Sequence, residues 1–420
     1  MPVASPEVLA KAARPGRMRD AALRAWTAAR AAPRKSGALL RGSVRGNRSL
    51  HSRERRLVQE GLFTMVRRSR GLHALLGTDR PLALWLGWLT LEGLDPAVAA
   101  AELAGPSWEA LATRWDGLGD GARPRERLAL RHSVSDGLAR QLVSSLGAQE
   151  AEAFLIASDA RGPVTVRANR LRCTREELQH RLAREGVPTQ SSGCAPDGLE
   201  VAGRHNLAAL ASFRDGWFEV QDEGSQRLAA LVDPDGPVVD FCAGAGGKTL
   251  ALAAHGVPVI ALDVRRHALR ELEKRAKRAG AQVETFAIAP QGPLPMAVAG
   301  LRASRVLVDA PCTGTGTLRR HPEHRWLLDR QAIRDRSRQQ AGILSRAARL
   351  VAPGGRLIYG TCSVLRSENE AIVDAFLADH GDWALWGPPL RTAPHVDGAD
   401  GFFGAVLAAP SGGAPESDLG

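Results

Sequence analysis

The alternation of apolar and helical segments between residues 226 and about 380 constrains the fold of this 420-residue chain more than any other feature. The apolar segments are VVDF, VIALDV, VETFAIA, RVLVDA and GRLIYGTC, and helical segments such as HALRELEKRAKRAG lie between them. This order predicts a parallel sheet covered by helices on both faces. Two later strands, WALWG and GFFGAVLA, have no helix between them and predict an antiparallel pair at one edge.

Two smaller regions precede this α/β domain, which we place at residues 226–410. Residues 1–150 have apolar residues at helical spacing with arginines on the opposite face, which predicts an all-α bundle. Residues 151–225 combine strand-like segments such as VTVRAN with the helical segment TREELQHRLAREGV, which predicts a small α+β module. The polar residues 411–420 predict a disordered tail. The chain is therefore expected to be multidomain.

Positive charge is concentrated at the N-terminus. The whole chain has a net charge of +11, and residues 1–70 alone carry 17 Lys and Arg against 4 Asp and Glu. A basic module on a near-neutral body suggests a polyanionic partner such as a nucleic acid. The alternative is a set of solvated arginines on helix surfaces.

The cysteines and the apolar segments indicate the compartment. None of the 5 cysteines lies in a C-x-x-C or Cys/His cluster, so we expect no metal site and no disulfide framework. No apolar signal core is evident at the N-terminus, and the segment LALWLGWLTLEGL is too short to span a bilayer. We expect a cytoplasmic protein without a membrane partner.

The segment VVDFCAGAGGKT predicts a strand followed by a glycine-rich turn and a helix, a unit that can hold a ligand close to the backbone. It ends like a phosphate-binding loop, but Cys242 occupies the place of that loop's first glycine, which disfavours an NTPase. The dinucleotide pattern does not fit either. Asp263 ends the second strand, where an acidic side chain can bind ribose hydroxyls. A nucleoside such as S-adenosylmethionine or a dinucleotide would satisfy both features.

Polar residues and cysteines follow the fourth and fifth predicted strands. Asp309 and Cys312 follow the fourth strand, and Cys362 follows the fifth. If these strands are neighbours, their backbones lie roughly 5 Å apart and both thiols face one cleft. Buried cysteines are commonly core residues, but two of them at a ligand-binding edge favour nucleophilic catalysis.

These segments together resemble the Sun-type family of RNA cytosine-5 methyltransferases. The resemblance rests on DFCAGAGGKT, VDAPCTGTGTLRRHPEHRW, PGGRLIYGTCS, SENE and DGFF, and on VRANRLRC and FEVQDEGSQ in the small module. It implies a Rossmann-like class I methyltransferase domain, an accessory RNA-binding module and a NusB-like helical bundle. This three-part order is similar to that of the members that act on bacterial 16S ribosomal RNA.

The resemblance also implies roles for individual residues. Cys362 would attack carbon 6 of cytosine, Cys312 would assist product release, and Asp309 would hydrogen-bond the ring near N3. The roles of the two cysteines could also be exchanged, as in the related DNA enzymes. S-adenosylmethionine would be bound by Cys242, Ala243, Gly244, Ala245, Gly246, Gly247, Lys248, Asp263 and Asp309. The turn lacks the proline that is usual in the family, and no Asp follows the third strand to contact the adenosine.

Three arginines after the fourth strand, Arg319, Arg320 and Arg325, are expected to contact RNA phosphates. The expected partner is 16S ribosomal RNA, and the expected oligomeric state is a monomer. Two alternatives stay open: a methyltransferase that acts on transfer RNA or large-subunit ribosomal RNA, and a non-catalytic RNA-binding factor with a relic methyltransferase domain.

Overall fold

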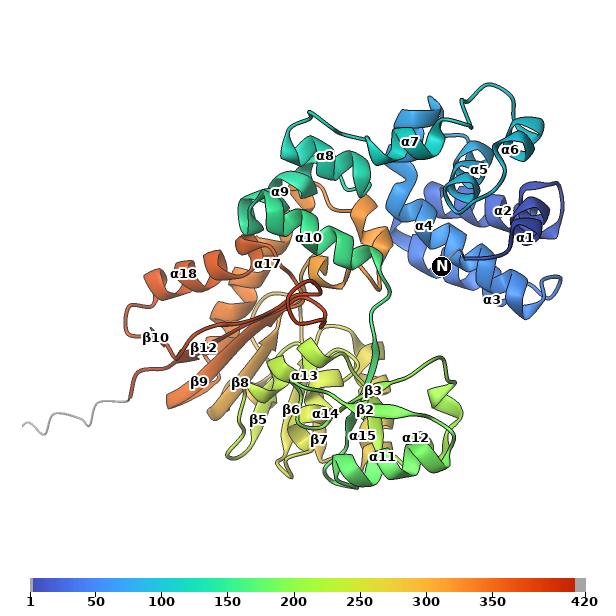
Figure 1. Cartoon of the computed structure of the whole chain (residues 1–420). Coiled ribbons are helices and arrows are strands. Elements are labelled where there is room, and N and C mark those ends of the chain that lie inside the picture. The colour runs from blue at the N-terminus through green and yellow to red at the C-terminus, as the bar shows by residue number, and fades with distance from the viewer. Residues whose placement is uncertain (1–2, 412–420) are drawn as a thin grey trace, which may run out of the picture. The chain divides into compact units, whose positions relative to one another are not determined.

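The computed structural model describes residues 3–411 and contains two compact units (Figure 1). The first unit comprises the chain up to Arg161 together with residues 317–332, and the second comprises residues 162–316 and the chain from Ile333 onward. Apart from Ser411, the expected tail lies outside the described residues.

The first unit is all-helical in the described part of the chain, as the sequence predicts. Its α-helices are α1 (Pro6–Ala13), α2 (Arg17–Ala31), α3 (Ser36–Arg45), α4 (Ser52–Leu76), α5 (Pro81–Leu91), α6 (Pro96–Glu102), α7 (Leu111–Asp116), α8 (Pro124–Arg131), α9 (Asp136–Leu146) and α10 (Ala148–Asp159). The boundary that we expected at residue 150 lies inside α10. The apolar segment at 82–94 forms most of α5, whose indoles Trp85 and Trp88 are fully buried.

A segment distant in sequence completes this helical unit. Residues 317–332 contain the 3₁₀ helix η4 (Pro322–Trp326), and Trp326 packs against the helical core. The indole rings of Trp26 on α2 and Trp326 meet edge to face, with centroids 5.2 Å apart. The segment begins five residues after Cys312, so one piece of chain leaves the fourth predicted strand and enters the helical unit.

The second unit is built on a large mixed sheet, in the strand order β10-β12-β9-β8-β5-β6-β7. The strands are β5 (Val238–Asp240), β6 (Val259–Asp263), β7 (Val283–Ala287), β8 (Ala303–Asp309), β9 (Val351–Thr361), β10 (Ala384–Leu385), β11 (Leu390–Thr392) and β12 (Phe402–Ala408). Strands β5 to β9 are parallel, as predicted, and β12 pairs antiparallel with β9. The short strand β11, which pairs with β12, was not predicted.

Four of the helices of this sheet follow the predicted alternation, whereas the first and the fourth of those named next were not predicted. The helices are α13 (Glu223–Ala230), α14 (Gly247–Ala253), α15 (Arg266–Ala279), α16 (Met296–Ala299), α17 (Arg330–Ala348) and α18 (Glu370–Asp379). Strand β5 pairs with both β6 and β8, so the strand order reverses at β5. In sheets of this kind, ligands bind outside the carboxyl ends of the strands at that reversal.

The small α+β module belongs to the same compact unit as the large sheet. Its antiparallel sheet has the order β2-β3-β1-β4, formed by β1 (Val164–Ala168), β2 (Thr189–Ser191), β3 (Gly198–Val201) and β4 (Phe218–Val220). Helix α11 (Arg175–Arg184) and the short helix α12 (Ala211–Arg214) accompany it. The Glu219 carboxylate forms ion pairs with Arg275 and Arg278 of α15, which join the module to the large sheet. Among the described residues, no helix is long and apolar enough to cross a membrane.

Candidate active site

The glycine-rich turn between β5 and α14 needs glycine at one position for two independent reasons. Gly246 has a φ of +88°, and a Cβ atom added there would lie 2.1 Å from Cδ1 of Leu272. Gly244 also has a positive φ, of +56°. The carbonyl of Ala245 accepts a hydrogen bond from Arg275, so the turn is held from α15 although it lacks the proline usual in the family. The turn is therefore defined by close packing against α15.

Asp263 lies at the carboxyl end of β6, where it faces this turn. Its carboxylate accepts hydrogen bonds from the backbone N–H groups of Gly244 and Arg265, each at 2.7 Å, and from the Arg265 side chain. Although burial opposes ionisation, these bonds hold the pKa of Asp263 below its ordinary value. Asp263 is thus an ionised acceptor beside the glycine turn, as ribose binding requires.

A buried lysine links the turn to the end of β8. Lys248 Nζ lies 2.7 Å from Asp309 Oδ2, and the lysine side chain is only 8% exposed. Burial alone would lower the pKa of Lys248, but the Asp309 carboxylate outweighs it and the pKa lies above its ordinary value. The ion pair orients the Asp309 carboxylate at the strand end without using both of its oxygens.

A second carboxyl group, Asp240, lies under the turn. Burial raises the pKa of Asp240 to about 7, against the effect of a hydrogen bond from Thr249. Its Oδ1 atom is buried and has no hydrogen-bond partner. Cys242, which follows in the turn, is half-buried, and burial of its thiol raises the pKa of that thiol well above the ordinary value. Cys242 is therefore a neutral wall of the site.

The structure brings the two predicted cysteines together. β8 and β9 are neighbouring parallel strands, with Asp309 opposite Gly360, and the Sγ atoms of Cys312 and Cys362 lie 3.3 Å apart. The hydrogen bond with Cys362, together with burial, raises the pKa of Cys312 well above its ordinary value. Cys312 is consequently a neutral thiol that can donate to Cys362.

Glu368 fixes the loops that carry both cysteines, a role that the sequence analysis missed. Its buried carboxylate accepts hydrogen bonds from the backbone N–H and hydroxyl of Thr313, next to Cys312, and from the hydroxyl of Ser363, next to Cys362. Gln340 of α17 adds a fourth hydrogen bond at 3.1 Å. The segment SENE contained the signal, because an acidic residue soon after the fifth strand is placed to reach back to the strand ends.

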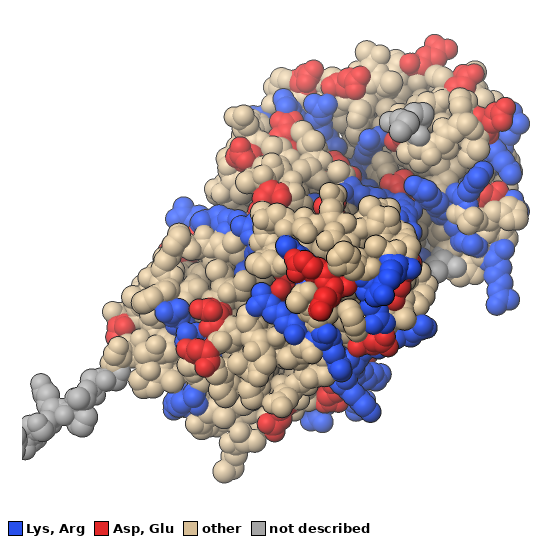
Figure 2. All heavy atoms as spheres, turned by 60° about the horizontal axis from the view of Figure 1, so that its bottom comes forward, with Lys and Arg blue, Asp and Glu red and all other residues tan. Residues whose placement is uncertain are grey.

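The three arginines expected to contact RNA lie in different environments. Arg325 is completely buried in the helical unit, where it forms an ion pair with Asp159 at 2.8 Å and donates to the carbonyl of His132. In this position its guanidinium is not available to a surface phosphate. Arg319 is also buried, whereas Arg320 is half-buried. On the face shown in Figure 2, Lys and Arg groups are interspersed with Asp and Glu.

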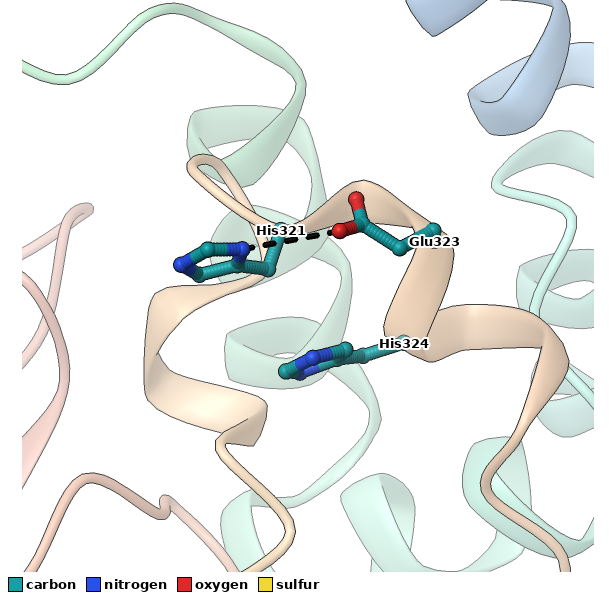
Figure 3. A group of neighbouring side chains, drawn as sticks. All are labelled: His321, Glu323 and His324. Carbon is teal, nitrogen blue, oxygen red and sulfur yellow. Dashed lines mark ion pairs between the residues drawn. The ribbon is translucent and has the colours of Figure 1, made fainter. Parts of the chain in front are cut away.

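One group of side chains has the composition of a metal site. His321, Glu323 and His324 offer ligand atoms within 4.8 Å of one another (Figure 3). The two imidazoles are stacked, with planes 15° apart, so their in-plane lone pairs do not point at a common centre. The Glu323 carboxylate already lies 3.3 Å from Arg41 and 3.5 Å from His321. We therefore interpret this group as an ion-pair cluster and assign no metal to it.

Comparisons with known proteins match the chain over most of its length. A family model described as 16S rRNA methyltransferase RsmB/F matches residues 229–408, and an RsmF/B-like ferredoxin-like domain model matches residues 136–208. Ribosomal RNA small subunit methyltransferase B of Sodalis glossinidius (strain morsitans) is 31% identical over 394 residues, which cover 85% of this chain and 90% of the relative.

Solved structures give the same fold. PH0851 superposes with a TM-score of 0.73 at 26% identity, covering 92% of this chain and 97% of the other. NSun6 from Pyrococcus horikoshii, solved with SFG, superposes with a TM-score of 0.58 at 21% identity, covering 65% of this chain and 98% of the other. The first likeness extends over the helical unit as well as the sheet.

Proposed function

Because the chain belongs to the 16S rRNA methyltransferase RsmB/F family, we propose that it transfers a methyl group from S-adenosylmethionine to carbon 5 of a cytosine in RNA, with bacterial 16S ribosomal RNA as the substrate. The observation that carries the chemistry is the pair of thiols 3.3 Å apart at the ends of β8 and β9. The Lys248–Asp309 ion pair stands beside them. The helical unit and the small module would hold the surrounding RNA.

The glycine turn and Asp263 fit the methyl donor. Gly244 and Gly246 allow close backbone approach, and the ribose hydroxyls would take the place of the Arg265 side chain, which is 56% exposed, on the Asp263 carboxylate. Lys248, Asp309 and the remaining turn residues, Cys242, Ala243, Ala245 and Gly247, complete the proposed site. S-adenosylmethionine supplies an electrophilic methyl group there.

The cysteines divide the remaining chemistry between them. Carbon 5 of cytosine is a weak nucleophile, so the Cys362 thiolate first forms a bond to carbon 6, which makes carbon 5 electron-rich. As this bond forms, N3 takes a proton from solvent, and the Asp309 carboxylate accepts a hydrogen bond from the N3–H group, which favours the protonated ring. After methylation, carbon 5 loses its proton and the bond between carbon 6 and sulfur breaks, which restores the aromatic ring and the Cys362 thiolate.

Cys312 would act in the release step. Its hydrogen bond to Cys362 holds it as a neutral thiol before reaction. Once the Cys362 sulfur is bonded to carbon, it is no longer a free thiolate that accepts the hydrogen bond from Cys312. The Cys312 thiol can then lose its proton more readily. Once that proton has passed to solvent, the Cys312 thiolate is the group placed to receive the carbon-5 proton. The target base must leave its stack to reach either thiol.

The test is to trap the covalent adduct. The Cys312→Ala variant is mixed with unmethylated 16S ribosomal RNA and S-adenosylmethionine and examined for a protein–RNA band that resists denaturation. We expect the band with Cys312→Ala and none with the double variant that also carries Cys362→Ala. A band with Cys362→Ala alone would reverse the roles. No band in either variant, with methyl-donor binding intact, would argue against this RNA as substrate.

A further inference from the structure

The helical unit contains a cavity of about 590 Å³ that has no part in the chemistry described above. It lies between α2, α4 and the segment 317–332, and its walls include two indoles and several cationic side chains. The lining residues that matter here are Trp26, Arg30, Arg70, His73, Arg325 and Trp326. Among the described residues that line it, Asp79 is the single carboxylate. This volume lies within the range of small-ligand sites.

Two of these side chains have buried donors without acceptors. Arg325 is 0% exposed, and only its Nη1 atom is used, by Asp159 and the carbonyl of His132. Its Nε and Nη2 atoms and the Nε1 atom of Trp326 are buried without a hydrogen-bond partner. A buried donor left unpaired lowers the stability of the folded state. A ligand rich in acceptors would therefore be favoured in this cavity.

The aromatic side chains favour a flat ligand. Trp26 and Trp326 meet edge to face at 5.2 Å, and the Arg30 guanidinium lies over the Trp326 ring at 4.8 Å. Arg30 is exposed, so it can turn between the ring and the solvent. Unstacked RNA bases bind by stacking on aromatic rings and arginine planes, while cationic side chains take the phosphate. Indoles, unpaired donors and cations together match one nucleotide.

We propose that this cavity binds a single unstacked nucleotide of the RNA substrate, away from the cytosine that is methylated. The base lies against Trp326, its acceptors meet the free donors of Arg325 and Trp326, and Arg30 and His73 contact the phosphate. Arg325, which the sequence suggested as a surface phosphate contact, would thus bind RNA from inside the helical unit. The inference rests on the proposed function only in taking RNA as the ligand.

The test compares Arg30→Ala with Arg24→Ala, an exposed arginine on the same helix that does not line the cavity. Binding of a short single-stranded RNA fragment is measured by fluorescence anisotropy at fixed salt. We expect Arg30→Ala to weaken binding about tenfold and Arg24→Ala less than twofold. Equal effects of the two variants would overturn the proposal, because they would indicate general charge attraction.

A second measurement locates the nucleotide directly. RNA containing 4-thiouridine is photocrosslinked to the full-length protein, and the modified peptides are identified. Crosslinks to residues 17–30 or 317–332 that Arg30→Ala diminishes are expected, and their absence in the presence of RNA binding would refute the cavity. Methyl transfer by the unaltered protein is assayed in parallel. If the RNA is methylated but the cavity is not labelled, this inference fails and the proposed function stands. If the cavity is labelled but the RNA is not methylated, the nucleotide site stands and the proposed function fails.

Discussion

At the scale of single residues, Glu368 controls the geometry of the two thiols without being placed to touch the substrate. Its carboxylate accepts hydrogen bonds from Thr313, which is next to Cys312, and from Ser363, which is next to Cys362. In Glu368→Gln, an NH2 group replaces one carboxylate oxygen. That group cannot accept the hydrogen bonds that Thr313 and Ser363 donate. Hydrogen bonds to charged groups contribute about 1.5–3 kcal/mol each. We expect the methylation rate to fall at least tenfold and the thermal midpoint to drop, with methyl-donor affinity unchanged.

The matched control is Glu271→Gln, whose carboxylate is 55% exposed on α15. It should change neither the rate nor the thermal midpoint. The positioning role predicts one further signature: the covalent adduct in the Cys312→Ala background should form more slowly when Glu368 is also replaced. Adduct formation at an unchanged rate would leave Glu368 with a purely structural role.

Asp240 gives the protein a specific pH dependence of stability. Its pKa is about 7 in the folded chain and about 4 when unfolded, so the folded state binds the proton more tightly. The folded state therefore loses stability as the pH rises from about 4 to about 7. Asn at this position keeps an acceptor for Thr249 but has no charge. Between pH 5 and pH 8, Asp240→Asn should gain roughly 3 kcal/mol of unfolding free energy relative to the unaltered protein.

Urea unfolding at the two pH values measures this difference directly. The gain should appear progressively, with half of it complete near pH 6 and most of it by pH 7. A stability difference that stays constant over the range would mean that the pKa of Asp240 is not raised by burial.

At the scale of elements, the turn between β5 and α14 tolerates little change. Ala at position 246 would have to adopt a φ of +88° and place its Cβ 2.1 Å from Leu272. We expect Gly246→Ala to reduce S-adenosylmethionine affinity more than tenfold, as measured by calorimetry. Gly342→Ala on α17 is the control, because its Cβ would meet nothing within 4 Å. Equal affinities for the two variants would contradict a rigid turn.

The parallel strands and the polar residues at their carboxyl ends could be predicted because their signals are local. Each buried strand is an apolar run, and the polar residue that ends it, such as Asp263 or Asp309, is visible in the sequence. Strand β11, by contrast, is three residues long and pairs only with β12. Only its pairing in the folded chain, and not its amino-acid composition, identifies it as a strand. The NusB-like character of the helical bundle remains a prediction.

Arg325 shows why part of the site could not be predicted. Among the arginines after Cys312, nothing local distinguishes a solvated side chain from a buried one. The difference is made by Asp159 and the carbonyl of His132, which are remote in sequence. Only the folded chain brings these groups together.

At the scale of the whole molecule, residues 317–332 belong to the helical unit, whereas the chain directly before and after them belongs to the sheet unit. Removing one partner of a buried ion pair costs about 3–5 kcal/mol. We therefore expect Arg325→Met to lower the unfolding free energy by this amount and to broaden or split the thermal transition. Arg338→Met, 76% exposed on α17, is the control and should have no measurable effect. An equal loss of unfolding free energy in both variants would show that the buried ion pair does not stabilise the protein.

The return of the chain at residue 317 also has a consequence during synthesis. The ribosome releases the helices up to Arg161 long before it has made Trp326, so the face of the bundle beside Trp26 stays open while residues 162–316 emerge. The helical unit, which is synthesised first, can therefore be completed only after strand β8 has been made. A truncated chain that stops before residue 317 therefore keeps an unfinished bundle in addition to a sheet that lacks β9 and β12.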